Sequence, residues 1–200
     1  MLIAFSLLQS QTIVMFKKTV AFLLASVIFF SLSSFKTDEP QSDGIHWMSL
    51  EQAFAATQKN PKKVLIDVYT GWCGWCKVMD KKTFTNPEVI KYVNENYYAV
   101  KLDAESKDDI TIGSVTYSYN DANRANDVAV ALLQGKMSYP SIVYLDEQFN
   151  MIQPIPGYQE ARQFHEIITF IGGNFHKKES FDTYKAGTYK KLYSSALAGL

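Results

Sequence analysis

The 200-residue sequence has only two cysteines, no excess of charge of either sign and no internal repeat. Its 20 basic and 20 acidic residues balance, so it lacks the basic face that a nucleic-acid partner normally requires. A structural zinc site usually takes four ligands, and the sequence has neither a second cysteine pair nor two closely spaced histidines. We therefore expect no nucleic-acid partner and no metal site. We assign no role to the isolated residues His46, His165 and His176.

Residues 1–35 have the three parts of a secretory signal peptide. Lys17 and Lys18 precede an apolar run over residues 20–30, and small residues follow. The run is shorter than the roughly 20 apolar residues of a membrane span. We therefore expect cleavage and a periplasmic or secreted protein, with an uncleaved membrane anchor as the alternative. The signal begins at Met15, which we expect to be the true start, and no nearby cysteine offers a site for lipid attachment.

The rest of the sequence divides into a linker, one domain and a tail. Residues 36–44 are polar and contain proline and glycine, which is typical of a linker. Residues 45–172 form the expected domain, and residues 173–200 are a Lys- and Tyr-rich, partly helical extension. Residues 103–120 are polar and predict a long surface loop.

Periodicity and capping signals predict the secondary structure of the domain. A capping box at Ser49 and Gln52 opens the first helix, and Asn86-Pro87 opens another. Strand–helix–strand followed by a hairpin and a final helix implies an α/β sheet with helices on both faces. The predicted helices span residues 50–59, 73–84, 87–96, 121–134 and 160–171, and the predicted strands span residues 64–69, 98–102, 141–145 and 151–155.

Cys73 and Cys76 lie in the segment Trp72–Lys77, directly after the buried strand 64–69. The partial positive charge at a helix N-terminus favours the thiolate of Cys73. Cys76 lies one turn along, where it can attack a mixed disulfide and release the product. This spacing predicts a thiol–disulfide oxidoreductase that acts on protein thiols and disulfides and needs no bound organic cofactor.

Two other interpretations of the cysteines are weaker. An inert structural disulfide would add little stability, because the loop closed by Cys-x-x-Cys is short. A cysteine protease is disfavoured, because the aromatic residue of the papain-type stretch is misplaced and His165 lies too close in sequence.

The order of elements, with Cys-x-x-Cys at the first strand–helix junction, resembles the thioredoxin fold over residues 45–172. The resemblance implies an α/β thioredoxin fold: a central mixed β-sheet flanked by helices, here with an extended C-terminal tail. It also implies a buried aspartate, its paired lysine, a cis-proline loop and a glycine before the last helix. These match Asp67, Lys101, Tyr139-Pro140 and Gly157.

The segment that follows Cys76 is similar to a secreted group within the thioredoxin-like superfamily. That group includes the C-terminal domain of the membrane disulfide reductase of bacterial periplasms. The departures from thioredoxin itself are Gly74-Trp75 between the cysteines and a longer region over residues 103–134. Gly74 and Trp75 cannot stabilise a Cys73 thiolate by charge, an ionised Asp67 would disfavour it, and Lys77 compensates only in part. These charges favour a reductase that a membrane electron donor keeps reduced. The alternatives are an oxidase or isomerase of the same fold and a non-catalytic binding module.

The remaining site residues have a functional and a plain interpretation. Asp67 is expected to accept a proton from Cys76 with its pKa raised by burial, or else to face a polar edge. Lys101 either moderates that shift or is an ordinary exposed lysine, and Pro140 is expected to be cis rather than trans. Trp72 is expected to pack against the site and limit access to it, and the expected substrate-binding residues are Trp72, Trp75, Tyr139 and Pro140. Trp75 is either a platform for substrates or the start of a helix.

Overall fold

The computed structural model describes residues 44–200. The predictions of a signal peptide over residues 1–35, of a start at Met15 and of a linker from residue 36 lie outside the described residues, apart from Gly44.

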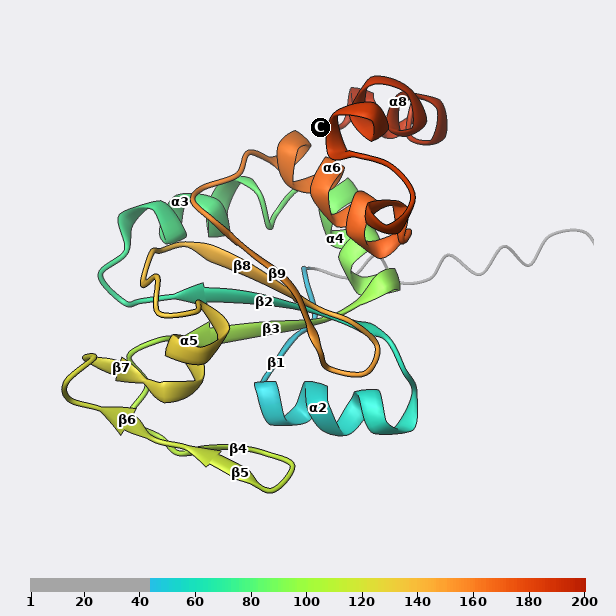
Figure 1. The fold of residues 1–200 in the computed structure, drawn as a ribbon. Coiled ribbons are helices and arrows are strands. Elements are labelled where there is room, and N and C mark those ends of the chain that lie inside the picture. The colour runs from blue at the N-terminus through green and yellow to red at the C-terminus, as the bar shows by residue number, and fades with distance from the viewer. Residues whose placement is uncertain (1–43) are drawn as a thin grey trace, which may run out of the picture. The chain divides into compact units, whose positions relative to one another are not determined.

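A five-stranded mixed sheet runs through the centre of the domain (Figure 1), with the order β1-β3-β2-β8-β9. The central strand β2 (Lys63–Tyr69) is parallel to β3 (Tyr97–Asp103) and antiparallel to β8 (Ser141–Leu145). The edge strands are β1 (Trp47–Met48), parallel to β3, and β9 (Met151–Pro156), antiparallel to β8. The mixed sheet confirms the predicted fold class. β1 was not predicted, because two residues carry no measurable periodicity.

The near-continuous apolar character of β2 has a simple cause. Every residue from Lys63 to Val68 is buried, because β2 has a neighbouring strand on each side and helices over both faces of the sheet. A strand in that position has no solvent face to alternate with, so it is apolar throughout. Asp67 interrupts the apolar run and is nevertheless buried.

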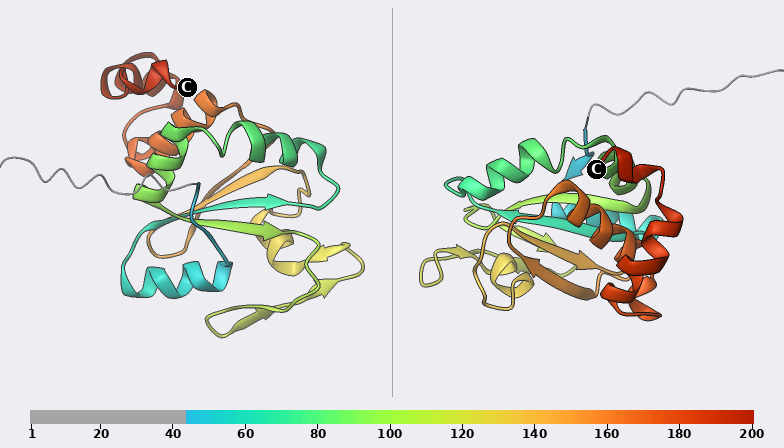
Figure 2. Two further views of the ribbon diagram at one scale, coloured as in Figure 1. Left: turned by 180° about the vertical axis from the view of Figure 1, so that it is seen from behind. Right: turned by 90° about the horizontal axis from the view of Figure 1, so that it is seen from above.

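Helices cover both faces of the sheet (Figures 1 and 2). On one face lie α3 (Gly74–Lys82), α4 (Pro87–Asn96) and α6 (Ala161–Gly172), whose apolar residues join one core cluster. On the other face lie α2 (Leu50–Lys59) and α5 (Asp127–Leu132), which belong to the second cluster. The predicted capping box of α2 is present, since Ser49 and Gln52 bond each other's backbone amides. The predicted apolar faces of these helices therefore pack on the sheet as expected.

The prediction of a loop over residues 103–120 was wrong. The segment forms a hairpin of β4 (Ile110–Ile112) and β5 (Val115–Tyr117), with Gly113 at φ +62° in the turn between them. Ile110 packs into the core while Thr111 and Thr116 face solvent and share a hydrogen bond. This alternation is the period of a strand, but it covers too few residues to stand out in the sequence.

The predicted helix over residues 121–134 was wrong in its N-terminal part. A second small sheet of β6 (Tyr119–Asn120) and β7 (Ala125–Asn126) precedes α5. The helix begins at Asp127, because the side chain of Asn126 accepts a hydrogen bond from the amide of Val128. An N-cap of this kind sets where a helix starts.

The C-terminal extension is helical in part, as predicted, and packs against α6. In Figure 2 the extension lies beside α6. The side chains of Tyr184 and Tyr189 are fully buried. Nδ1 of His165 in α6 and the hydroxyl of Tyr189 share a 2.9 Å hydrogen bond. The extension contains η1 (Phe175–Lys177), α7 (Phe181–Thr183), η2 (Tyr184–Thr188), α8 (Tyr189–Leu192) and η3 (Ala196–Ala198).

Candidate functional site

The two cysteines form a disulfide at the start of α3, where the chain turns from β2 into the helix. Cys73 is the N-cap residue of α3, and the Cα atoms of Cys73 and Cys76 lie 5.3 Å apart. The backbone amide of Cys76 donates a 3.1 Å hydrogen bond to Cys73 Sγ. Both residues are buried, with 4% of Cys73 and 3% of Cys76 exposed. A donor aimed at Cys73 Sγ at a helix N-terminus is an arrangement that stabilises a thiolate at that atom.

Asp67 and Lys101 form the ion pair that the sequence predicted. Lys101 Nζ donates a 2.7 Å hydrogen bond to Asp67 Oδ2, and Asp67 is only 1% exposed. Burial raises the pKa of Asp67, and the charge of Lys101 opposes part of that rise. Burial by itself would lower the pKa of Lys101, but its carboxylate partners outweigh this effect and raise the pKa. Asp67 Oδ1 has no hydrogen-bond partner among the described residues, so it is available to accept a proton.

A second carboxylate at this position was missed by the sequence analysis. Asp80 of α3 also accepts a hydrogen bond from Lys101, and its negative charge adds to the rise in the pKa of Asp67. Asp80 lies four residues after Cys76, so helical periodicity places the two on one face of α3. That spacing is the signal that could have found it.

The Tyr139–Pro140 peptide bond is cis, as predicted. The carbonyl of Pro140 accepts a 2.7 Å hydrogen bond from the amide of Gly157, so the loop before β8 is tied to the loop after β9. Gly157 has φ +96°, a conformation that residues with a Cβ rarely adopt. The pairing places Tyr139 and Pro140 beside the first residues after β9.

The tryptophans of the motif are exposed, and each contacts a second aromatic ring. Trp72 is 67% exposed and lies edge-to-face with Tyr139, with ring centroids 5.9 Å apart. Trp75 is 62% exposed, and its ring lies 5.3 Å from that of Tyr158. Trp72 Nε1 also donates a 3.0 Å hydrogen bond to Glu105, which follows β3.

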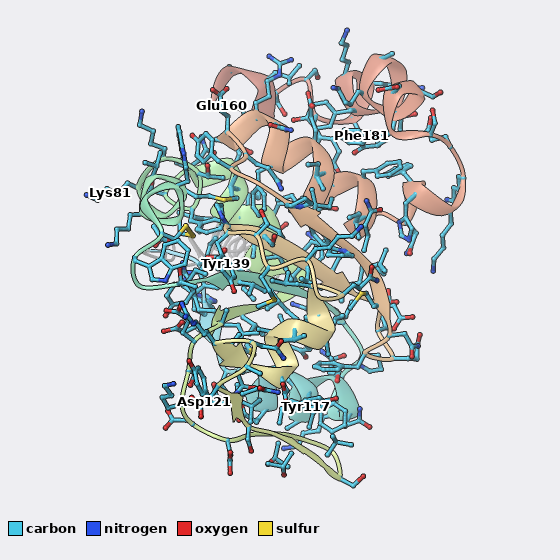
Figure 3. The ribbon with its side chains drawn as sticks, turned by 60° about the vertical axis from the view of Figure 1, so that its left-hand side comes forward. Lys81, Tyr117, Asp121, Tyr139, Glu160 and Phe181 are labelled. Carbon is cyan, nitrogen blue, oxygen red and sulfur yellow. A yellow bond between two sulfur atoms is a disulfide. The ribbon has the colours of Figure 1, made fainter. Side chains whose placement is uncertain are left out.

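Glu105 and Tyr158 were not identified from the sequence, because only the folded sheet brings their loops together. Figure 3 labels Tyr139 in the loop before β8, with Lys81 on α3 and Glu160 at the start of α6 above it. Residues 103–134, the region that is longer than in thioredoxin, are called the insertion below. Two of its residues, Tyr117 and Asp121, lie at the far end of the same view. No pattern within either loop marks these residues as members of the site.

Three other features of the described residues bear on function. No group of three or more His, Cys, Asp or Glu side chains within residues 44–200 could hold a metal ion. None of the helices in this part of the chain is long and apolar enough to cross a membrane. A polar pocket of about 390 Å³ lies between α4, α6 and the tail, lined in part by Tyr92, His165 and Tyr193, and it contains none of the predicted site residues.

The family described as Thioredox_DsbH (Protein of unknown function, DUF255) matches residues 31–178 of this chain. The chain belongs to that family. The match spans the disulfide, the Asp67–Lys101 pair and the cis-proline loop, together with the first residues of the tail. It therefore confirms the predicted membership of the thioredoxin-like superfamily.

Two curated relatives illustrate the similarity. The thiol:disulfide interchange protein DsbD of Cronobacter sakazakii is 33% identical over 112 residues, which are 55% of this chain and 17% of the relative. Spermatogenesis-associated protein 20 of Mus musculus is 32% identical over 60 residues, which are 30% of this chain and 8% of the relative. The chain thus spans less than a fifth of the length of either protein.

A solved structure supports the fold. A thioredoxin-fold protein from Helicobacter pylori has a TM-score of 0.51 to this chain at 20% identity. The alignment covers 73% of this chain and 99% of that protein. The architecture is therefore the thioredoxin fold that the sequence predicted.

Proposed function

We propose that the protein is an exported thiol–disulfide oxidoreductase that reduces disulfides in protein substrates. The chain belongs to a thioredoxin-fold family whose relatives include a thiol:disulfide interchange protein, and it contains the Cys73–Cys76 pair. The observation that carries the proposal is the disulfide at the N-terminus of α3, with the Cys76 amide directed at Cys73 Sγ.

The proposed reaction is two successive exchanges. The thiolate of reduced Cys73 attacks one sulfur of the substrate disulfide, that S–S bond breaks, and the other substrate sulfur leaves as a thiolate. Cys76 then attacks Cys73 Sγ, which releases the second substrate thiolate and forms the Cys73–Cys76 disulfide. Two electrons pass from the protein to the substrate. A dithiol donor, which we propose to be a membrane protein, must return them.

Asp67 is the proposed proton acceptor for Cys76, acting through water. A carboxylate with an ordinary pKa would be a weak base near neutral pH, and burial raises the pKa of Asp67 toward that range. The charge and hydrogen bond of Lys101 oppose part of this rise. The free oxygen Oδ1 is the atom that would receive the proton.

The proposed substrate contacts are Trp72, Trp75, Tyr139 and Pro140. The two tryptophans offer exposed apolar surface next to the reacting sulfurs. Exposed apolar surface of this kind marks a place where a partner binds. The cis-proline loop directly precedes Ser141, which pairs with Val68 near the end of β2, so an extended substrate segment can run past the disulfide there.

The reducing direction is supported by the charges near Cys73. Gly74 and Trp75 cannot stabilise a thiolate by charge, and Asp67 disfavours a second negative charge nearby. Lys77 compensates only in part, because it is exposed. A less stable thiolate makes the disulfide form relatively stable, which is the property of a reductant.

Export is the part of the proposal that rests on residues 1–35. We propose that this leader directs the protein to the periplasm or out of the cell, that residues 36–44 form a linker, and that residues 45–172 and 173–200 form the domain and its extension. Mass spectrometry of the exported protein should find no residue before about Ser31. Recovery of the intact leader on the exported protein would favour the anchored alternative.

Activity can be tested with two variants that serve as controls for each other. The purified protein should catalyse reduction of insulin disulfides by dithiothreitol, and Cys73→Ser should abolish this activity. Cys76→Ser should instead accumulate mixed disulfides with substrates, because the attacking residue remains and the resolving residue is lost. Activity retained by Cys73→Ser would refute the proposed role of Cys73, whereas a wild-type protein without this activity would favour a non-catalytic binding module.

The direction can be tested by equilibrating the Cys73–Cys76 pair with glutathione. A potential more reducing than about −180 mV, the level of disulfide isomerase, supports the reductase. A more oxidising value would favour the oxidase or isomerase alternative.

A further inference from the structure

The motif that holds the disulfide also holds the two most exposed large apolar side chains in residues 44–200. The others in this part of the chain are Val115 on the hairpin and Leu192 on the tail, and both are smaller. Trp72 and Trp75 are both more than half exposed. Tryptophan is the residue type most enriched at sites that dominate binding energy, so this placement indicates contact with a partner.

Trp72 is held in place by two contacts from different loops. Its Nε1–H donates to Glu105, and its ring lies edge-to-face with Tyr139. The negative charge of Glu105 adds to the effect of burial and raises the pKa of the Tyr139 hydroxyl. Glu105 is itself fixed, since its amide donates to the side chain of Asp103 at the end of β3. The Trp72 ring is therefore oriented before any substrate binds.

Trp75 is held by one contact, from Tyr158. The rings lie 5.3 Å apart at an angle of 36°, which is an offset, tilted packing. Tyr158 follows β9, whose Pro156 pairs with Ser141 of β8, and the neighbouring Gly157 bonds Pro140. The loop that bonds the cis-proline loop therefore also carries the residue that supports Trp75.

We propose that Glu105 and Tyr158 are positioning residues that hold Trp72 and Trp75 as an aromatic surface around the disulfide, and that this surface selects polypeptide substrates with an apolar side chain next to the reacting cysteine. The proposal rests on the proposed oxidoreductase function and names its substrate class. The chemistry of the exchange is unchanged: the substrate disulfide is reduced and Cys73–Cys76 is oxidised.

The surface distinguishes polypeptides from small disulfides for two reasons. An apolar side chain beside the substrate cysteine can bury surface against the tryptophans, whereas oxidised glutathione has no large apolar group. Glutathione also carries carboxylates, and Glu105 and Asp103 would repel them at the Trp72 side of the surface. Preorganised rings add to the preference, because less side-chain entropy is lost when the substrate binds.

The test uses two disulfide-linked peptides that differ only in Leu or Gly next to the cysteine, with oxidised glutathione as the small disulfide. The wild-type protein should reduce the Leu peptide with the highest kcat/KM, mainly through a lower KM. Tyr158→Ala and Glu105→Ala should each lower the Leu-to-Gly ratio of kcat/KM roughly two- to tenfold, the range expected for one aromatic contact.

Conservative variants separate positioning from general damage. Tyr158→Phe keeps the ring and Glu105→Gln keeps an acceptor for Trp72, so both should retain the wild-type ratio. Leu192→Ala removes an exposed apolar side chain on the tail and should change nothing. Melting temperatures of all variants identify any that fail to fold. If Tyr158→Ala does not fold, the comparison of Glu105→Ala with Glu105→Gln decides the outcome.

The possible results separate this inference from the function on which it rests. Equal kcat/KM for the Leu and Gly peptides in the wild-type protein, or an unchanged ratio in both alanine variants, would overturn the inference and leave the oxidoreductase intact. A wild-type protein that reduces none of the three substrates would overturn the proposed function as well.

Discussion

Lys101 Nζ donates a 2.7 Å hydrogen bond to Asp67 Oδ2 across two strands in which these residues are direct partners. The parallel register of β2 and β3 brings a buried carboxylate and a half-buried amine together in the centre of the sheet. Lys101 also lies 5.0–5.2 Å from the ring centroids of Trp47, Tyr69 and Phe84, which restrict its position. The charge of Asp67 is therefore compensated by a cation that the core holds in place.

Replacing Asp67 by asparagine should increase stability at neutral pH. The folded-state pKa of Asp67 is raised above the ordinary 3.8, so the folded wild type loses stability as the pH rises from 3.8 through that higher value. The Asn variant has no such loss, and Lys101 keeps Asp80 as a partner. The free energy of unfolding of Asp67→Asn relative to wild type should be larger at about pH 7 than at about pH 4, as measured with urea on the oxidised proteins.

The control for this prediction is Asp121→Asn, which changes an exposed carboxylate in the insertion. It should alter stability by less than about 0.5 kcal/mol at either pH. If Asp67→Asn changes the free energy of unfolding by the same amount at both pH values, burial does not raise the pKa of Asp67.

Acidification should weaken the attachment of the tail through His165. Burial lowers the pKa of His165 from 6.5 to about 4, so the unfolded chain takes up a proton in that window and the folded chain does not. The free energy of unfolding therefore falls as the pH drops from 6.5 toward 4. The rings around His165 belong to Tyr92, Tyr189 and Tyr193, none of which compensates a positive charge with a negative one.

His165→Gln tests this prediction in urea unfolding. The variant should be less stable than wild type at about pH 7.5, and the deficit should shrink at about pH 5 because the variant lacks the histidine penalty. The control is His46→Gln, at an exposed histidine. Its difference from wild type in free energy of unfolding should be the same at both pH values. A deficit for His165→Gln that grows on acidification would contradict the prediction.

Removing the ring of Tyr184 should strongly destabilise the domain. Tyr184 is fully buried and packs against Phe170, Phe175 and Tyr189. Loss of a buried aromatic ring leaves a cavity and typically costs about 3–5 kcal/mol. Urea denaturation should show a loss of at least about 3 kcal/mol for Tyr184→Ala. A loss near that of the exposed control Leu192→Ala would mean that the tail does not pack on the domain in solution.

Asn126 should be required for the insertion to fold, because it serves two backbone segments at once. It is fully buried, its Oδ1 caps α5, and its Nδ2 donates to the carbonyls of Ser106 and Asp108. Asn126→Ser keeps a cap and loses the donor, which should cost about 1–3 kcal/mol. Asn126→Ala loses both and should cost about 1 kcal/mol more. Equal stability of the two variants in urea would refute the capping role.

The local parts of the fold could be predicted from the sequence. The capping box at Ser49, the cap at Asn86 and the strands β2 and β8 depend on residues that are close in the chain, so their signals lie within short windows. The placement of Cys73 and Cys76 at a strand–helix junction is local in the same sense.

The start of α5 shows where local signals fail. Helical spacing over residues 121–134 predicts an inward-facing set, all of which is buried: Ala125, Val128, Ala129, Leu132 and Leu133. The helix still begins only at Asp127, because Asn126 is held by the carbonyls of Ser106 and Asp108, about twenty positions earlier in the chain. A periodic pattern is therefore compatible with both outcomes, and long-range hydrogen bonds decide between them.

By itself the sequence determined that two thiols meet at the start of a helix, that an acid interrupts an otherwise apolar strand and that apolar runs alternate with amphipathic segments. Only the tertiary structure decided that Glu105 and Tyr158 contact the two tryptophans. It also decided that the tail packs against α6 and buries Tyr184 and Tyr189. The physical reason is that sheet register and side-chain packing join residues far apart in the chain. Their contacts are set by the geometry of the whole core, and no short stretch of sequence contains that information.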